Sequence, residues 1–354
     1  MSKRVLLTGV GGFIGAHCLE YFLNHTDWEI IGIDSFRHKG TYRRVEEASK
    51  RHLDFIKDKN DNRDRFKVYY HDLAAPIDDQ LEKLILNRRL ENGNIVEDKI
   101  DYIVNMASDS AVERSTQDPR HCLFNNYELA FNMLEFARKI KPEIFFQVST
   151  DEVYGEAEPD QAHGEWDVIM PSNPYAASKA AQEAMAISYW RTYGVPVVLT
   201  NTMNNIGEWQ DPEKFLPKII QKVYKGEEVP IYGDSPDSIG TRFYMHAKNH
   251  ADAFVFLSQF PPALYEEGSK RPDRYNICGD IELNNLELAQ IIAKSMGKEL
   301  KYKLIKSESA RKGYDRRYAL DGSKMKEEGW NPPISFESSI NQIVNWTLEN
   351  PHWI

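Results

Sequence analysis

Residues 5–15, Val-Leu-Leu-Thr-Gly-Val-Gly-Gly-Phe-Ile-Gly, run from a short apolar segment straight into three glycines with GxxGxxG spacing. The apolar run predicts a buried strand, and the amphipathic stretch at 13–25 predicts a helix directly after it. Glycines at such a junction allow a tight turn and let the backbone approach a diphosphate, which the N terminus of a helix attracts. This stretch therefore predicts the opening of a dinucleotide-binding fold.

The alternation of strand and helix continues through the first two hundred residues. Strands are predicted at Val5–Thr8, Glu29–Asp34, Phe66–Tyr70, Tyr102–Met106, Ile144–Ser149 and Val197–Thr200, and helices at 13–25, 42–58, 78–90, 124–140 and 175–193. Strands that are apolar throughout suit a parallel sheet covered on both faces. The sequence thus predicts an α/β fold with a Rossmann-like doubly wound parallel sheet.

The pattern becomes less regular after about residue 205, with helical patterns at 213–225, 247–259, 284–296 and 335–349. We expect an NAD-binding domain at 1–205, with a return of 228–260 to it, and a smaller C-terminal α/β domain at 206–354 that binds a nucleotide-sugar. The segment 36–65 is rich in charged residues and predicts a solvated helical excursion.

Composition excludes several classes of protein. The 354 residues carry a formal net charge of −10, which argues against nucleic acid as the main partner. Three separated cysteines without a CxxC pair predict neither a zinc site nor a disulfide framework, and fit a reducing compartment. The scattered histidines show no HxH or HExxH spacing, so we expect no metal site. Without a membrane-length apolar stretch, the expectation is a cytoplasmic protein with no membrane partner.

Acidic residues at the ends of the second and third strands bear on the cofactor. Asp34 follows the glycines by about twenty residues, where a carboxylate accepts hydrogen bonds from a ribose and repels a 2′-phosphate. This favours NAD over NADP, although Arg37 close by keeps NADP open. Asp72 stands where an acid can meet the adenine amino group, or can cap a helix.

Two further patterns point to chemistry. Tyr175 and Lys179 are four residues apart on a predicted helix, so they share one face. A cation beside a phenol lowers the pKa of the phenol, which makes Tyr175 usable as a base.

Asp151 and Glu152 stand together in STDEVYG, at the end of a predicted buried strand. Such a pair is either part of a solvated loop or an acid and a base.

Six motifs carry a resemblance to a known family over nearly the whole length. They are TGVGGFIG (8–15), STDEVYG (149–155), NPYAASKAA (173–181), TNTMNNIGEWQDPEKFLPKII (200–220), YNICGD (275–280) and YDRRYALDGSKMKEEGWNPP (314–333). The chain resembles the extended short-chain dehydrogenases/reductases, specifically the nucleotide-sugar 4,6-dehydratases. The resemblance implies a homodimer formed through the helices at 124–140 and 175–193.

The resemblance also implies a mechanism. Tyr175 would take the proton of the sugar C4 hydroxyl, with Thr150 hydrogen-bonded to the same oxygen, while a hydride passes from C4 to NAD. Glu152 would remove the C5 proton, and a protonated Asp151 would let the C6 hydroxyl leave as water before the hydride returns to C6. Two neighbouring carboxyl groups can serve as acid and base when their pKa values are split.

Further site residues follow from the motifs and the resemblance together. Cofactor positions, besides Tyr175 and Lys179, are Gly9, Gly12, Phe13, Ile14, Gly15, Asp34, Ser35, Asp72, Leu73, Met106, Ala107, Ser108, Asn126 and Asn205. Substrate positions are Ser110, Thr150, Asn204, Lys214, Phe215, Pro230, Ile231, Tyr232, Arg242, Asn276 and Arg311. A guanidinium such as that of Arg242 suits the diphosphate, because it can bind phosphate oxygens with two hydrogen bonds.

Some positions depart from the pattern of the family. Ala111 and Tyr314 each replace a His, Ile206 and Glu208 replace the Tyr and Pro of NNYGP, and His246 stands near the Tyr of RDWLYV. The resemblance favours dTDP-glucose. Because the departing positions surround the nucleotide base, the diphosphate or the rim of the sugar, UDP-glucose and an unusual sugar stay open. The alternatives are a UDP-sugar 4-epimerase or decarboxylase, which needs no second acid, and a non-catalytic nucleotide-binding protein.

Overall fold

The computed structural model describes residues 2–58, 65–90, 93–266, 268–306, 313 and 315–353. The chain forms two compact units. The first unit comprises Met1–Ser149, Pro174–Thr200 and Phe254–Tyr275, and the second comprises Thr150–Asn173, Asn201–Ala253 and Asn276–Ile354. These boundaries differ from the predicted division at 205 with a return of 228–260.

Local contacts explain both differences. The backbone of the segment 150–173 is hydrogen-bonded within the second unit, from Ala157 N–H to the Arg317 carbonyl and from His163 N–H to the Ala319 carbonyl. The return to the first unit begins at Phe254, whose ring packs 5.3 Å from the ring of Phe146 in the main sheet. The segment 228–253 belongs to the second unit.

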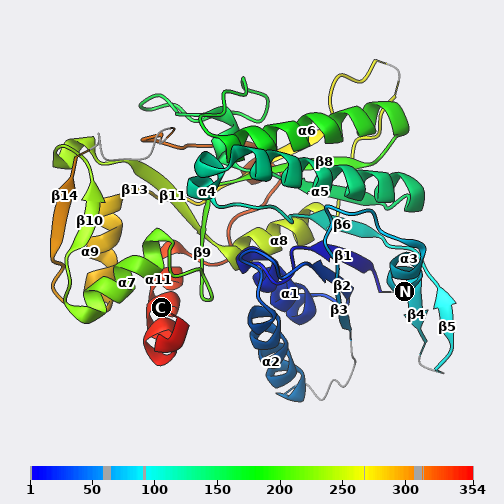
Figure 1. Cartoon of the computed structure of the whole chain (residues 1–354), viewed down its shortest axis with the longest axis horizontal. Coiled ribbons are helices and arrows are strands. Elements are labelled where there is room, and N and C mark those ends of the chain that lie inside the picture. Colours follow the sequence, from blue (N-terminus) through cyan, green and yellow to red (C-terminus); the bar gives the residue numbers. More distant parts are fainter. Residues whose placement is uncertain are drawn as a thin grey trace. The chain divides into compact units, whose positions relative to one another are not determined.

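A seven-stranded sheet with the order β12-β8-β7-β6-β1-β2-β3 organises the first unit (Figure 1). The pairings among β1, β2, β3, β6, β7 and β8 are all parallel. Its strands are β1 (Arg4–Thr8), β2 (Glu29–Asp34), β3 (Phe66–Tyr70), β6 (Tyr102–Asn105), β7 (Ile144–Val148), β8 (Val197–Thr202) and β12 (Asp273–Ile277). The predicted doubly wound parallel sheet is confirmed, with each predicted strand present.

The helices of the first unit are α1 (Phe13–His25), α2 (Tyr42–Asp58), α3 (Asp79–Leu86), α4 (Val112–Gln117), α5 (Pro119–Ile140) and α6 (Pro174–Tyr193). In Figure 1, α5 and α6 lie side by side on one side of the sheet, and α1 and α2 pack together on the other. Helix α2 is solvated on one side only, because Val45, Ala48, His52 and Ile56 are buried at helical spacing. The strand order reverses between β1 and β6, which is where sheets of this kind bind ligands.

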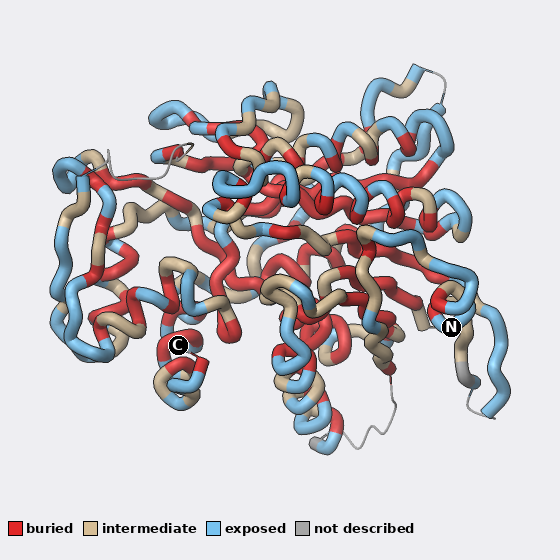
Figure 2. The backbone as a smooth tube through the Cα atoms, in the orientation of Figure 1, coloured by how far each residue is buried: buried red, intermediate tan, exposed pale blue. Residues whose placement is uncertain are grey.

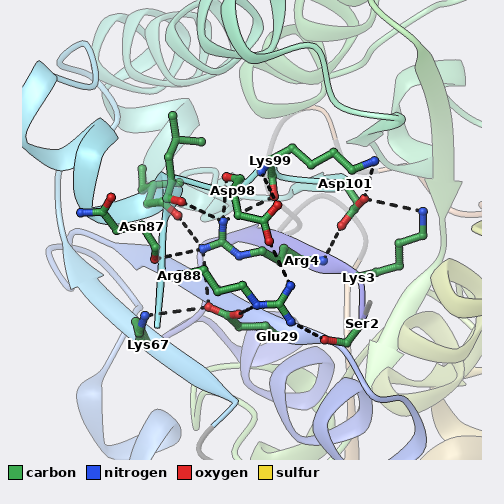
Figure 3. Close-up of polar contacts among 12 residues, drawn as sticks. Ser2, Lys3, Arg4, Glu29, Lys67, Asn87, Arg88, Asp98, Lys99 and Asp101 are labelled. Carbon is green, nitrogen blue, oxygen red and sulfur yellow. Dashed lines mark hydrogen bonds and ion pairs between the residues drawn. The ribbon is translucent and has the colours of Figure 1, made fainter. Parts of the chain in front are cut away.

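The predicted helix at 78–90 is too long, and Arg4 gives the physical reason. Helix α3 ends at Leu86, and the chain continues as the antiparallel pair β4 (Asn87–Arg89) and β5 (Ile95–Glu97). The Arg4 guanidinium is almost fully buried and donates to the carbonyls of Ile85, Leu86 and Asp98 at 2.9–3.1 Å (Figure 3). The orphan carbonyls at the end of α3 are thus satisfied by a buried cation rather than by another helical turn.

The second unit has its own apolar core. Its elements are η1 (Asp151–Tyr154), β9 (Asn204–Ile206), α7 (Phe215–Lys225), β10 (Val229–Tyr232), η2 (Pro236–Ser238), β11 (Thr241–His246), α8 (Ala247–Leu257), β13 (Glu282–Asn284), α9 (Asn285–Ser295), β14 (Tyr302–Ile305), α10 (Ser323–Glu327), α11 (Phe336–Glu349) and η4 (Pro351–Trp353), of which α8 runs past Ala253 into the first unit. Residues of α7, β10, α9 and α11 form one buried cluster. Figure 2 shows the central strands β1, β6 and β7 of the main sheet as buried, whereas the edge strand β3 is only partly buried.

Among the helices of the described residues, none combines the length and the hydrophobicity that a bilayer crossing requires.

Candidate active site

The glycine-rich turn after β1 has the geometry of a diphosphate cradle. Gly9 has a φ of +72°, and a Cβ on Gly15 would lie 2.1 Å from the Gly9 carbonyl oxygen, so neither position accepts a side chain. No side chain of the described residues caps the N terminus of α1, where Phe13 and Ile14 are the first helical residues. Their N–H groups and the positive end of the helix dipole therefore remain for an anionic ligand. The turn thus fits the diphosphate of a dinucleotide.

Asp34 is held against this turn. Its Oδ2 accepts a hydrogen bond from Gly11 N–H at 2.8 Å and its Oδ1 accepts one from Phe36 N–H at 2.7 Å. Burial raises the pKa of the Asp34 carboxyl, while the two backbone donors oppose that rise. Each carboxylate oxygen keeps a lone pair for a ribose hydroxyl.

Asp72 follows β3 in a backbone turn. Its Oδ1 accepts from Ala74 N–H at 3.1 Å, and its Oδ2 lies 2.5 Å from Nη1 of Arg37. Arg37 also donates to Asn125 Oδ1 at 2.7 Å. Asp72 caps no helix, because Asp78 is the N-cap of α3, so the capping alternative is wrong; its carboxylate is instead engaged by a turn N–H and by Arg37. Arg37, which kept NADP open, is engaged by Asp72 and Asn125.

The loop after β6 is fixed by hydrogen bonds from two directions. The N–H groups of Met106 and Ala107 both donate to Oγ1 of Thr8 at 3.0 Å. Asn126 is fully buried: it accepts from Asp109 N–H and donates to the Asp109 carbonyl and to Ser178 Oγ. Asn126 thus holds the predicted cofactor loop in place, and its side chain is occupied by protein atoms.

The remaining predicted positions of the first unit lie at the same carboxyl edge of the sheet. Ser35 follows β2, Leu73 follows β3, and Ser108 and Ser110 follow β6. The Ser108 hydroxyl is buried and has no hydrogen-bond partner among the described residues, whereas Ser110 is exposed.

Tyr175 and Lys179 lie in the first turns of α6. The Lys179 ammonium is buried, and its Nζ donates to Oε1 of Gln182 at 2.8 Å. Burial lowers the pKa of Lys179 to about 8, so most of the side chain keeps its charge at neutral pH. A buried cation one helical turn from a phenol favours ionisation of that phenol. The arrangement suits Tyr175 for work as a base.

Gln182 was not predicted, although it completes this helix face. Its Oε1 also accepts from Gln147 Nε2 at 3.2 Å, and its Nε2 donates to the Asn126 carbonyl at 2.6 Å. Gln182 therefore joins Lys179 to β7 and α5. The only signal in the sequence is its spacing of three residues from Lys179, which alone marks nothing more than a helical neighbour.

The acid pair opens the second unit, directly after β7. Thr150 caps the short helix η1, and its hydroxyl donates to Asp151 Oδ1 at 2.9 Å. Asp151 is buried, and its Oδ2 has no hydrogen-bond partner among the residues described. Burial, and next the charge of Glu152, raise the pKa of Asp151 to about 7. The carboxyl is therefore substantially protonated at neutral pH, and a proton on Oδ2 is free of protein acceptors.

Glu152 is in a different environment. It is only partly buried, and its Oε2 accepts a hydrogen bond from Asn173 Nδ2 at 3.0 Å. This hydrogen bond orients the Glu152 carboxyl group. Asn173 was not predicted as a site residue, although it opens the NPYAASKAA motif. The two acids thus have the asymmetry that the acid–base interpretation requires, and the solvated-loop alternative is wrong for the buried Asp151.

The predicted substrate residues of the second unit differ in how far their side chains are exposed. Lys214 and Phe215 are half-buried at the N terminus of α7, Asn204 and Tyr232 are exposed, and Pro230 is half-buried. Ile231 is fully buried in the apolar core, so its side chain is not available for ligand contact. Arg311 lies outside the described residues.

Three buried polar residues of the second unit, the predicted substrate residues Arg242 and Asn276 and the predicted cofactor residue Asn205, are engaged within the protein. Arg242 donates to the carbonyls of Thr241, Asp315 and Arg316 at 2.6 Å, with its guanidinium 4.3 Å above the ring of Tyr318. Asn276 donates to the carbonyls of His163 and Asp321. Asn205 donates within its own turn. The Oδ1 atoms of Asn205 and Asn276 are buried and lack a partner among the described residues.

Comparison with known proteins decides the family. The sequence profile described as GDP-mannose 4,6 dehydratase matches residues 6–343. The chain belongs to this family. A dTDP-glucose 4,6-dehydratase of Shigella flexneri is 30% identical, over 99% of this chain and 94% of that protein. The trifunctional UDP-glucose 4,6-dehydratase/UDP-4-keto-6-deoxy-D-glucose 3,5-epimerase/UDP-4-keto-L-rhamnose-reductase of Arabidopsis thaliana is 30% identical, over 99% of this chain and 48% of that protein.

The fold agrees with that of solved dehydratases. The crystal structure of the dTDP-glucose 4,6-dehydratase DesIV from Streptomyces venezuelae, with NAD and TYD bound, is similar at a TM-score of 0.77. The two chains are 29% identical, and the match covers 99% of this chain and 98% of the other. The predicted family of nucleotide-sugar 4,6-dehydratases is confirmed.

In this member of the dehydratase family, the predicted catalytic residues are distributed over both compact units. Tyr175 and Lys179 belong to the first unit with the glycine turn and Asp34, whereas Thr150, Asp151 and Glu152 belong to the second. Asn205, predicted for the cofactor, also belongs to the second unit. The structure thus brings together the cofactor set and the helix pair in one unit, and the acid pair with most of the substrate set in the other.

Proposed function

We propose that the chain catalyses the NAD-dependent dehydration of a nucleoside-diphosphate-glucose, with dTDP-glucose ahead of UDP-glucose, to the 4-keto-6-deoxy sugar nucleotide. The observation that carries this proposal is the contrast between Asp151 and Glu152. A buried carboxyl with a pKa of about 7 stands next to a half-buried carboxylate held by Asn173. An epimerase or decarboxylase needs no such acid beside a base, and a protein without chemistry gains nothing from burying one.

Each residue has a definite task in this reaction. Tyr175, with the buried Lys179 ammonium one turn away, accepts the proton of the C4 hydroxyl, and Thr150 is the hydroxyl residue next to the acids. Glu152 removes the C5 proton, which the C4 ketone makes acidic. Asp151 donates its proton to the C6 hydroxyl so that water leaves.

The residues of the first unit fit NAD. The uncapped N terminus of α1 and the glycine turn suit a diphosphate, and Asp34 suits a ribose diol while disfavouring a 2′-phosphate. When bound, NAD would supply a hydride acceptor at C4 and a hydride donor at C6, so the reaction would leave it unchanged.

The choice of nucleotide and the homodimer rest on different support. The Shigella flexneri relative is named for dTDP-glucose and the Arabidopsis thaliana relative for UDP-glucose, at the same identity. The departures at Glu208 and His246 lie in the unit that carries most of the predicted substrate positions.

For the dimer, α5 exposes Phe124, Tyr127 and Phe131 at helical spacing, which is a suitable face for a second copy of the chain.

The test is mass spectrometry of the purified chain incubated separately with dTDP-glucose and UDP-glucose, without added NAD. Loss of one water from either sugar nucleotide supports the proposal and the retention of NAD, and the faster substrate identifies the base. If neither loses water, the incubation is repeated with added NAD and with GDP- and CDP-sugars. Failure under all of these conditions would show that the chain has the fold of the family without this reaction. An Asp151→Asn variant controls for a contaminating dehydratase.

A further inference from the structure

Two histidines and a carboxylate that are far apart in the sequence meet in the first unit. His38 lies in the loop after β2, Asp109 in the loop after β6, and His121 in the first turn and a half of α5. One ring nitrogen of each histidine and one carboxylate oxygen lie within 4.8 Å of one another. The positions 38, 109 and 121 share no motif spacing, which is why the sequence predicts no metal site here.

The orientation of the three groups is specific. Oδ2 of Asp109 lies 4.0 Å from Nε2 of His121, and the two imidazole rings meet edge to face with centroids 5.3 Å apart. Nε2 of His38 is buried and has no hydrogen-bond partner among the described residues. A buried imidazole nitrogen without a hydrogen-bond partner, on a ring that belongs to such a cluster, is a second observation that fits a ligand site.

Hydrogen bonds hold the Asp109 carboxylate in a fixed orientation, as they do for metal-ligating carboxylates. Oδ1 of Asp109 is engaged by the Arg114 guanidinium and by Ala111 N–H, so Oδ2 is the oxygen left facing the histidines. Asn126 fixes the backbone of Asp109 on both sides. Ligating carboxylates usually have such outer hydrogen bonds, which hold their orientation. Asp109 itself is almost fully buried, whereas the His121 side chain is 42% exposed and gives a route of entry.

We propose that His38, Asp109 and His121 bind one divalent transition-metal ion, with Zn²⁺ as the best match. Two imidazoles and one carboxylate are borderline nitrogen and oxygen ligands, which suit Zn²⁺, Co²⁺ or Ni²⁺, whereas Mg²⁺ and Ca²⁺ prefer oxygen alone. Tetrahedral Zn²⁺ places its ligand atoms about 3.3 Å apart, given Zn–N and Zn–O bonds of about 2 Å. The distances between the ligand atoms of His38, Asp109 and His121 therefore shrink by about an ångström when the metal ion binds. A loop histidine and an exposed helix-start histidine can make this adjustment by side-chain rotation.

The guanidinium groups of Arg114 and Arg37 lie near the cluster, and their positive charges repel a metal cation. Arg114 already neutralises Asp109, and Arg37 is held by Asp72. They lower the affinity of the site but leave its ligand atoms free. The metal would tie the loop after β2, which begins beside Asp34, to the start of α5. Its role is therefore to fix the cofactor-binding edge, and no step of the proposed reaction uses it.

The experiment uses the purified full chain with its retained cofactor, after removal of any affinity tag and treatment with a chelator. Co²⁺ is titrated while the visible absorption of tetrahedral Co²⁺ is recorded, and Zn²⁺ is titrated against a chromogenic chelator. We expect one equivalent to bind per chain and to raise the melting temperature. His38→Gln and His121→Gln should each weaken binding at least about 100-fold, since even outer-shell changes cost about 10- to 100-fold.

A matched control is His25→Gln, because His25 is an exposed histidine of the same unit that stacks on Tyr21 away from the cluster. This variant should bind Co²⁺ as the unmodified chain does. Far-ultraviolet circular dichroism shows that each variant is folded. The proposal is overturned if the unmodified chain binds no equivalent, or if either ligand variant binds as tightly as His25→Gln. In that case the two imidazoles form only an aromatic pair beside an acid.

Discussion

Oε2 of Glu208 lies 3.2 Å from Nε2 of His246 inside the second unit, and both side chains are almost completely buried. Lys248 N–H donates to Nδ1 of His246, and Gln342 donates to Oε1 of Glu208. Because Nδ1 accepts a hydrogen bond, the ring carries its proton on Nε2, which is the ring nitrogen close to the carboxylate. Two of the positions at which the sequence departs from the family pattern, Glu208 and His246, are therefore close neighbours. We expect them to act as one compensated change rather than as two independent ones.

A double-mutant cycle tests this compensation. Replacing Glu208 by Leu or His246 by Phe leaves the other polar group buried without its partner, which should lower the free energy of unfolding by about 3 kcal/mol in each case. The double variant should be less destabilised than the sum of the two, with a coupling of about 1–3 kcal/mol. Denaturant unfolding of the four proteins gives the values. Additive effects would show that the contact contributes nothing specific.

The second prediction separates the two acids by the step that they serve. Asp151→Asn keeps an acceptor for the Thr150 hydroxyl but has no proton to donate to the C6 oxygen. Water loss should slow by about 10²- to 10⁴-fold, the usual contribution of a general acid, while oxidation at C4 continues. In a single turnover, NADH fluorescence should therefore appear and persist. Loss of the fluorescence signal as well as of water elimination would contradict the separate role of Asp151.

Asp160→Asn is the matched control for this variant. Asp160 lies in the same unit, is exposed and has a φ of +61°, a conformation that Asn accepts as readily as Asp. The same change of charge at this position should leave both steps at their original rates.

The third prediction concerns pH and stability. The pKa of Asp151 rises from 3.8 to about 7 on folding, so the folded chain binds more protons than the unfolded chain between about pH 4 and pH 7. Stability must then fall as the pH rises through this window, by an amount on the order of 4 kcal/mol at about 1.4 kcal/mol per pKa unit. Asp151→Asn removes this loss. Relative to the unmodified chain, the variant should gain stability between pH 4 and pH 8, as denaturant unfolding at the two pH values would show.

Much of the fold was accessible from the sequence because buried parallel strands are apolar throughout. The run at Glu29–Asp34 predicted its buried strand to the residue. The run at Phe66–Tyr70 did so as well, although β3 is an edge strand that is only partly buried and contains Lys67. Helix α3 was predicted too long because its end depends on Arg4, a residue far away in the sequence. Helix α5 was predicted to start late, since its first turn depends on the Asp118 cap and Pro119 rather than on apolar periodicity.

The candidate site shows the same limit. Tyr175, Lys179 and the acid pair have sequence signatures, so they were named in advance. Gln182 and Asn173 act on them through hydrogen bonds that no spacing rule encodes. The burial that raises the pKa of Asp151 is likewise a property of the packed unit. A sequence shows that two acids are adjacent, but it does not show which of them is buried away from water.

The fourth prediction concerns Gln182 as a positioning residue for Lys179. Gln182→Leu removes the acceptor of the buried ammonium, so the pKa of Lys179 should fall further below its value of about 8. The rate of C4 oxidation falls where Lys179 loses its proton, and this alkaline limb should therefore move to lower pH. Gln182→Glu should move the limb to higher pH, because a carboxylate stabilises the charge. Stopped-flow rates across pH test this, and a limb that stays in place in both variants would exclude the role.

The fifth prediction concerns association of the chain. The rings of Tyr127 and Phe131 are parallel on α5, Phe124 continues the same stripe, and all three side chains are at least 41% exposed. A water-exposed aromatic stripe on a long helix is costly for a monomer, and a second copy of α5 would cover it. Phe131→Glu should therefore halve the mass measured by light scattering, because it places a charge in the covered face. Phe260→Glu, at a comparably exposed ring outside α5, should leave the mass unchanged. If the unmodified chain has the mass of a monomer, or if Phe131→Glu keeps the mass of a dimer, α5 is not the interface.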